Sequence, residues 1–94
     1  MSKQEAYREK AEAQLRAWKA DIEKLMARAD QAKAQGKIEY YKRAESFNTK
    51  YQIALRRSEE LKEATDDKWA EFKTGVEVAV AELRDALNNG LGKP

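Results

Sequence analysis

The chain contains no cysteine and no histidine. These residues supply most nucleophiles, general bases and transition-metal ligands in proteins, so the commonest catalytic and metal centres are excluded. No stretch approaches the roughly 20 apolar residues that a membrane-spanning helix needs. Residues 1–19 also lack the apolar centre of a signal peptide. The sequence therefore predicts a cytoplasmic, non-enzymatic protein with no catalytic residue, no cofactor and no metal site.

Helix-breaking residues are also scarce, with one proline and four glycines in 94 residues. The chain is 41% hydrophobic and 38% charged and is rich in Ala, Glu, Lys, Leu and Arg, a mixture typical of long helices. We predict an all-α protein with a single domain over residues 1–94: an elongated helical coiled coil, or an antiparallel helical hairpin or bundle of two to three helices. A chain this short buries little surface alone, so we expect it to self-associate.

The first apolar stripe predicts a helix that begins near residue 3. Its members recur every three or four positions, which places them on one face of a helix: Tyr7, Ala11, Leu15, Trp18, Ile22, Leu25, Ala29 and Ala32. Ser2 and Glu5 have the spacing of a capping box, in which each side chain accepts a hydrogen bond from a free backbone N–H group.

Gly36 is the first position where this helix could end. A helical glycine costs about 1 kcal/mol relative to alanine, but no capping residue stands beside it, and the apolar spacing passes through it from Ala32 to Tyr40. Two structures remain open. One is a continuous helix over residues 3–64, about 95 Å long at the helical rise per residue; the other is a hairpin of half that length, broken at Gly36.

A second apolar stripe continues the helical spacing through the middle of the chain: Tyr40, Ala44, Phe47, Tyr51, Ala54, Ser58 and Leu61. A single helix cannot bury such a stripe against itself. The stripe therefore predicts packing against another helix, either in the same chain or in another copy.

The third predicted helix is shorter and covers about residues 66–88. Thr65 can cap its start, and the carboxylates of Asp66 and Asp67 would stabilise the positive end of the helix dipole. The run Asn88-Asn89-Gly90 predicts its end, and residues 89–94 are expected to form a frayed tail.

Charge is distributed in two blocks of opposite sign. Residues 37–57 carry six basic and two acidic side chains, a net charge of +4, and residues 59–71 carry the reverse, a net charge of −4. Such blocks favour antiparallel or staggered pairing, because parallel pairing in register would stack like charges. The alternative is a solvated surface of mixed charge, in which exposed pairs contribute little.

Two other functions have less support from the sequence. The aromatic residues Tyr40, Phe47 and Tyr51 lie in the basic block and could stack on bases, but they occupy the apolar stripe and are expected to pack between helices. The net charge of the whole chain is only +2, which also argues against a dedicated nucleic-acid-binding protein. The last helix could lie on a membrane surface, but its polar face is acidic, which favours a partner helix instead.

Several segments share a pattern with a known group of proteins: Met1-Ser2-Lys3 through Ala6-Tyr7, Ala13-Gln14-Leu15 with Trp18 and Ile22, Lys37-Ile38-Glu39-Tyr40, and Glu60-Leu61-Lys62-Glu63-Ala64 running into Trp69, Phe72-Lys73 and Gly75-Val76-Glu77. In these segments the chain resembles small bacterial coiled-coil proteins, some of them described as stress-induced. The resemblance covers nearly the whole chain and implies no catalytic residues. Gly36 and the tyrosine-rich middle depart from the pattern of that group.

These patterns predict a structural or protein–protein interaction protein that self-associates, with the stress-related role that the resemblance implies. The alternatives are a peripheral membrane or lipid-binding protein and, after it, a nucleic-acid-binding protein. We expect a homo-oligomer or a partner helix, and no small-molecule substrate. The residues predicted to form the helix–helix interface are Leu15, Trp18, Ile22, Leu25, Phe47, Tyr51, Leu61, Trp69, Phe72, Val76, Val80 and Leu83.

Overall fold

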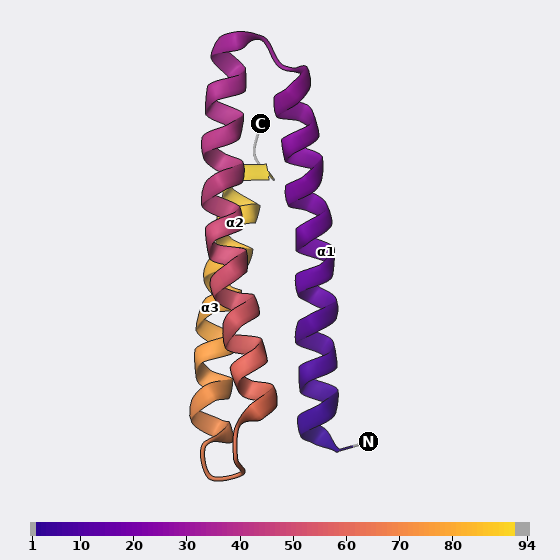
Figure 1. Ribbon diagram of the computed structural model, residues 1–94, viewed down its shortest axis with the longest axis vertical. Coiled ribbons are helices and arrows are strands. Elements are labelled where there is room, and N and C mark those ends of the chain that lie inside the picture. The colour runs from indigo at the N-terminus through magenta and orange to yellow at the C-terminus, as the bar shows by residue number, and fades with distance from the viewer. Residues whose placement is uncertain (1, 92–94) are drawn as a thin grey trace.

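The computed structural model describes residues 2–91, which form three helices and no strand: α1 (Lys3–Gln31), α2 (Ala34–Glu63) and α3 (Trp69–Leu91). The helices run up, down and up along one axis, so α2 is antiparallel to both of its neighbours (Figure 1). The molecule measures 51 × 21 × 21 Å and has a radius of gyration of 15.3 Å, against about 12 Å for a compact domain of this length. The predicted all-α fold class is confirmed, in the form of a rod-shaped three-helix bundle.

Helix α1 begins at Lys3, near the predicted residue, with the Ser2 hydrogen bond of the predicted capping box. The Ser2 hydroxyl accepts a hydrogen bond from the backbone N–H of Glu5 at 3.1 Å, and the Ser2 carbonyl accepts one from the N–H of Ala6 at 3.0 Å. These bonds satisfy N–H groups that have no partner inside the helix.

The chain reverses between α1 and α2 at Ala32 and Lys33, not at Gly36. Both residues of this turn are extended, with ψ angles of 157° and 159°, and the N–H of Ala32 donates to the carbonyl of Ala29 at 3.2 Å. Gly36 lies in the first turn of α2. The protein is therefore a hairpin and not a continuous helix, and the predicted position of its turn is wrong. Two extended residues suffice to reverse the chain, and the burial of the apolar stripes of α1 and α2 against each other stabilises the reversal.

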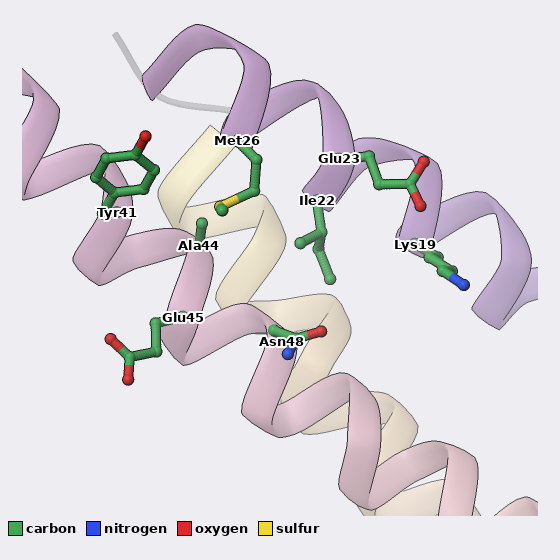
Figure 2. Close-up of a pocket in the computed structure, with 8 residues that line it drawn as sticks. All are labelled: Lys19, Ile22, Glu23, Met26, Tyr41, Ala44, Glu45 and Asn48. Carbon is green, nitrogen blue, oxygen red and sulfur yellow. The ribbon is translucent and has the colours of Figure 1, made fainter. Parts of the chain in front are cut away.

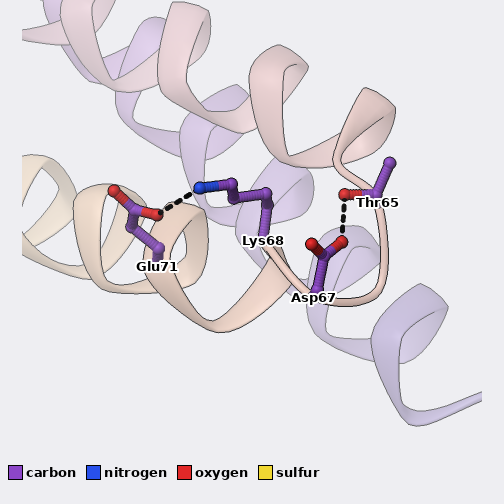
Figure 3. Close-up of polar contacts among 4 residues, drawn as sticks. All are labelled: Thr65, Asp67, Lys68 and Glu71. Atoms are coloured by element: carbon purple, nitrogen blue, oxygen red, sulfur yellow. Dashed lines mark hydrogen bonds and ion pairs between the residues drawn. The ribbon is translucent and has the colours of Figure 1, made fainter.

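The connection between α2 and α3 covers residues 64–68, and its polar contacts differ from the predicted cap (Figure 3). The Thr65 hydroxyl donates to the Asp67 carboxylate at 2.6 Å. The first helical turn of α3 starts from Lys68, whose carbonyl accepts from the N–H of Phe72 at 3.1 Å. Asp66 and Asp67 therefore lie in the turn before α3, so the predicted start at residue 66 is three residues too early.

The predicted end of the third helix is also wrong. Helix α3 continues through Asn88, Asn89 and Gly90 to Leu91. Leu87 has only 4% of its surface exposed, so packing of the bundle supports the helix beyond the local stop signal. The rest of the predicted tail, residues 92–94, lies outside the described residues.

All three helices contribute to one hydrophobic core: Leu15, Trp18, Ile22, Leu25, Ala44, Phe47, Tyr51, Ala54, Ala79, Leu83 and Leu87. Small residues recur at its contacts, and Ala29 and Ala54 are completely buried. Their size lets the helix backbones approach closely. In the described part of the chain, no buried side-chain nitrogen or oxygen lacks a hydrogen-bond partner.

Candidate interaction surfaces

The residues predicted to form a helix–helix interface lie inside the bundle. Most of them are buried: Leu15, Trp18, Ile22, Leu25, Phe47, Tyr51, Leu61, Val76 and Leu83. Trp69, Phe72 and Val80 are half-buried. The apolar stripes thus find their partners within the same chain, and surfaces for other molecules must lie elsewhere.

A groove between α1 and α2 lies near the turn that joins them; we call it the hairpin-end groove (Figure 2). It has a volume of about 560 Å³ and is lined by Lys19, Ile22, Glu23, Met26, Tyr41, Ala44, Glu45 and Asn48. Its apolar part includes Met26, which is 42% exposed. Ile38, which is 60% exposed, lies one helical turn from Tyr41 on the same side of α2.

The hairpin-end groove opens on the face of α1 and α2 that points away from α3. Helix α3 lies behind both helices in the view of the groove (Figure 2). The helical positions support this arrangement. Arg57, which donates a hydrogen bond to α3, lies on one flank of the buried stripe of α2, and Tyr41 and Asn48 lie on the opposite flank. One face of the α1–α2 hairpin is therefore covered by α3, and the other is open.

Tyr41 closes the end of this groove nearest the turn. Its hydroxyl donates a hydrogen bond to the carboxylate of Asp30 in α1. This bond is the main cause that raises the pKa of Tyr41, followed by burial and by the negative charge of Asp30. The bond joins the two helices beside the groove.

A second surface lies where α2 and α3 meet. Arg57 Nη1 donates to the carbonyl of Gly75 at 3.1 Å, so these residues mark the junction of the two helices. Ile53 lies one turn before Arg57, and Val78 lies one turn after Gly75. Since the helices are antiparallel, both side chains lie on the same side of this junction and at about the same height. They are 43% and 47% exposed, and we call them the Ile53–Val78 patch.

The charges around the Ile53–Val78 patch are sorted by helix. On α2, Lys50 and Arg57 lie three residues before and four residues after Ile53. On α3, the positions at helical spacing from Val78 carry the carboxylates of Glu71, Glu82 and Asp85. Glu60, two turns from Ile53, is the acidic exception on α2. The face therefore has a basic side, an acidic side and an apolar centre.

The third junction, between α1 and α3, is closed at the N-terminal end of α1 by an aromatic cluster. The rings of Tyr7 and Trp69 meet edge to face, with centroids 5.7 Å apart and planes at 75°. Lys73 Nζ lies 4.9 Å from the Tyr7 ring centroid and 5.6 Å from that of Trp69, within cation–π range. Burial raises the pKa of Tyr7, and the charge of Glu77 raises it further.

Sequence patterns located these surfaces only in part. Ile53 and Val78 are apolar residues that do not fall on the apolar stripes of their helices. An apolar residue outside the stripe indicates a surface at the edge of the buried face. Met26 and Tyr41 carry the same signal. No periodicity, however, indicates the contact of Tyr7 with Trp69, because these residues are 62 positions apart.

The described residues hold no group of three or more acidic side chains placed to bind a metal ion. None of their helices is long and apolar enough to cross a membrane. Comparisons of the chain with protein-family models, with curated proteins and with solved structures find no match.

Proposed function

We propose that the protein is a non-enzymatic structural interaction protein that self-associates through the Ile53–Val78 patch, as a two-fold dimer. The observation that carries this proposal is the self-complementary face around the patch. In a two-fold contact each copy contributes the same surface, so that surface must match itself. An apolar centre with a basic side and an acidic side meets this condition.

The charges favour rods that lie parallel, with the two-fold axis along their length. This arrangement lays α2 of one copy over α3 of the other at the same height, so Ile53 meets the second copy's Val78. Lys50 then faces Glu82 of the other copy, since both lie about one turn beyond the patch in the same direction. On the other side of the patch, Glu71 lies about two turns from Val78 at the height of Glu60, and Arg57 lies about one turn nearer the patch. Antiparallel rods would instead place α2 over α2 and bring Lys50 close to Arg57.

This orientation differs from the antiparallel pairing that the two charge blocks favour in the sequence. The two charge blocks favour antiparallel pairing where α2 meets its own copy as an isolated helix. In the bundle α2 lies beside the acidic flank of α3, so a second copy presents that flank to it. The local complementarity of the face therefore decides the orientation, because charges farther away than about 10 Å are screened at moderate salt.

The shape of the molecule also favours lateral association. The rod exposes 6796 Å² of surface, whereas a compact monomer of this mass exposes about 5,500 Å². Much of this surface lies along its sides. A dimer that pairs the rods side by side removes apolar area at Ile53 and Val78 from water.

The double variant Ile53→Asp/Val78→Asp tests the proposal by sedimentation equilibrium. Both side chains are exposed in the single chain, so we expect unchanged helicity and loss of the dimer. Ile38→Asp is the matched control, because Ile38 is an equally apolar and more exposed residue of α2 that lies about four turns away from Ile53 along the helix; it should remain dimeric. A monomeric wild-type protein, or a double variant that sediments as the wild type does, would overturn the proposal.

The orientation has its own test. The chain has no cysteine, so Asp67→Cys introduces one labelling site at one end of the rod. Parallel rods place two spin labels at this residue near each other, whereas antiparallel rods separate them by a large part of the 51 Å length. A long distance measured by pulsed electron spin resonance would refute the parallel arrangement and leave the dimer itself intact.

The two alternative functions gain little from the arrangement of the side chains. Val76, Leu83 and Leu87 of α3 are buried in the bundle and are not available to a membrane surface. Phe47 and Tyr51 are buried as well, so they cannot stack on bases. The stress-related role stays a prediction from the resemblance.

A further inference from the structure

We infer that the hairpin-end groove docks an amphipathic helix of another protein, one whose apolar stripe is flanked by lysine or arginine. This inference goes beyond self-association and uses a different face of the molecule. Recognition of this kind, in which a helix lays its apolar face into a groove, depends on a few anchor side chains at helical spacing.

The α1–α2 hairpin already binds one helix on its other face. Helix α3 covers that face and buries Val76, Leu83 and Leu87 against the hairpin. The open face offers a smaller apolar surface, made by Met26 and the ring of Tyr41, with the buried Ile22 and Ala44 at the floor of the groove. Because the groove residues of α1 span positions 19–26, about two helical turns, the groove suits two or three anchor side chains of one helix.

The charge of the open face selects the flanks of the docking helix. Glu23 stands on the α1 side of the groove and Glu45 on the α2 side (Figure 2). Positions at helical spacing from the groove residues extend this face along the rod. These positions carry the carboxylates of Glu5, Glu9, Glu12, Asp30 and Glu59 and the cations of Arg8, Arg16, Lys37 and Lys62. With Glu23, Glu45 and Lys19 in the groove itself, the face carries seven carboxylates and five cations. The face is therefore acidic although the whole chain carries a net charge of +2.

The same charges argue against a second copy as the occupant of the groove. Two copies that met through this face would bring one acidic surface onto another, and like charges across an interface are unfavourable. A helix with basic flanks removes this conflict. Its cations can reach Glu23 and Glu45 from both sides of its apolar stripe.

The groove and the Ile53–Val78 patch lie on opposite flanks of α2. A dimer formed through the patch therefore leaves both grooves open, at the same end of two parallel rods. Such a dimer binds two partner helices at once, and a partner with two helices gains avidity from it. This consequence rests on the proposed dimer, whereas the docking of one helix does not.

Two synthetic peptides test the inference by fluorescence anisotropy against the full chain. Both have 18 residues, blocked ends and the same leucine stripe; one has lysine on the flanks of the stripe and the other has glutamate. We expect the lysine peptide to bind and the glutamate peptide to bind at least ~10-fold more weakly, because its flanks face Glu23 and Glu45. Equal binding of both peptides, or of neither, would overturn the inference.

Variants locate the site and separate it from the dimer contact. Met26→Gln/Ile38→Gln should lower the affinity for the lysine peptide about 10-fold or more, since it removes two exposed apolar side chains of this face. The matched control is Ile53→Asp/Val78→Asp, which should bind the peptide as the wild type does even though it is monomeric. Unchanged binding to Met26→Gln/Ile38→Gln would refute the site. Dissociation of a wild-type dimer by this variant would also refute it, because the groove would then hold a second copy.

Discussion

Replacing Leu83 with alanine tests whether α3 packs into the hairpin of its own chain. Leu83 lies near the middle of α3, has 0% of its surface exposed and belongs to the core that joins all three helices. The substitution removes three buried carbon atoms and leaves a cavity that the surrounding helices fill only in part. A Leu→Ala change at such a site costs about 2–5 kcal/mol.

This cost is large against the stability of the whole protein. A domain of this length has a free energy of unfolding of about 5–14 kcal/mol. A loss near the middle of the range, about 3 kcal/mol, lowers the melting temperature by about 12–24 °C, because each kcal/mol corresponds to about 4–8 °C in a domain of this size. We therefore expect Leu83→Ala to remain helical at room temperature and to unfold much earlier on heating.

Urea denaturation followed by circular dichroism at 222 nm measures the difference. Val78→Ala is the matched control, since Val78 lies in the same helix but is 47% exposed; we expect a change within about 0.5 kcal/mol. All proteins are compared at one low concentration, so that association does not contribute unequally. A loss below about 1 kcal/mol for Leu83→Ala, or equal losses for both variants, would refute the packing of α3 described here.

Two further predictions concern the turn and the aromatic cluster. Gly36→Ala should stabilise the protein by up to about 1 kcal/mol in thermal unfolding. Gly36 is helical, and an added Cβ would lie 3.8 Å from the Ala32 Cβ, which is an ordinary contact. Destabilisation would show that the chain turns at the glycine after all. Burial, and then the charge of Glu77, raise the pKa of Tyr7 above 10.0. Above pH 10 the folded state therefore keeps a proton on Tyr7 that the unfolded state releases. This contribution to stability is fully present below pH 10 and is lost as the pH rises through the pKa of the folded state. As the pH rises above 10, Tyr7→Phe should therefore lose less stability than the wild type in urea titrations, and equal losses would contradict the assignment of this effect to Tyr7.

The spacing of apolar residues determined which side of each helix is buried. Leu15, Trp18 and Ile22 in the first stripe, and Phe47 and Tyr51 in the second, recur at the helical period and are all buried. This outcome is predictable because the removal of apolar side chains from water is the dominant driving force of folding and needs only one consistent face per helix. The start of α1 at Ser2 is equally local, since its hydrogen bond to Glu5 spans three residues.

Tertiary packing decided where the chain turns and where the last helix begins and ends. Ala32 and Lys33 form the turn without any residue typical of turns, and the Asn88-Asn89-Gly90 run continues as helix. In each case the local preference amounts to about 1 kcal/mol or less per residue, and the burial of side chains between helices outweighs it.

Packing also decided what lies on the two flanks of α2. A stripe has two equivalent flanks in the sequence, and nothing local states which of them faces α3. In the bundle Arg57 faces α3 and Tyr41 faces away from it, and this choice separates the Ile53–Val78 patch from the hairpin-end groove. The sequence by itself thus determined amphipathic helices and the face that each of them buries, while only the arrangement of the three helices created an acidic groove on one side and a self-complementary face on the other.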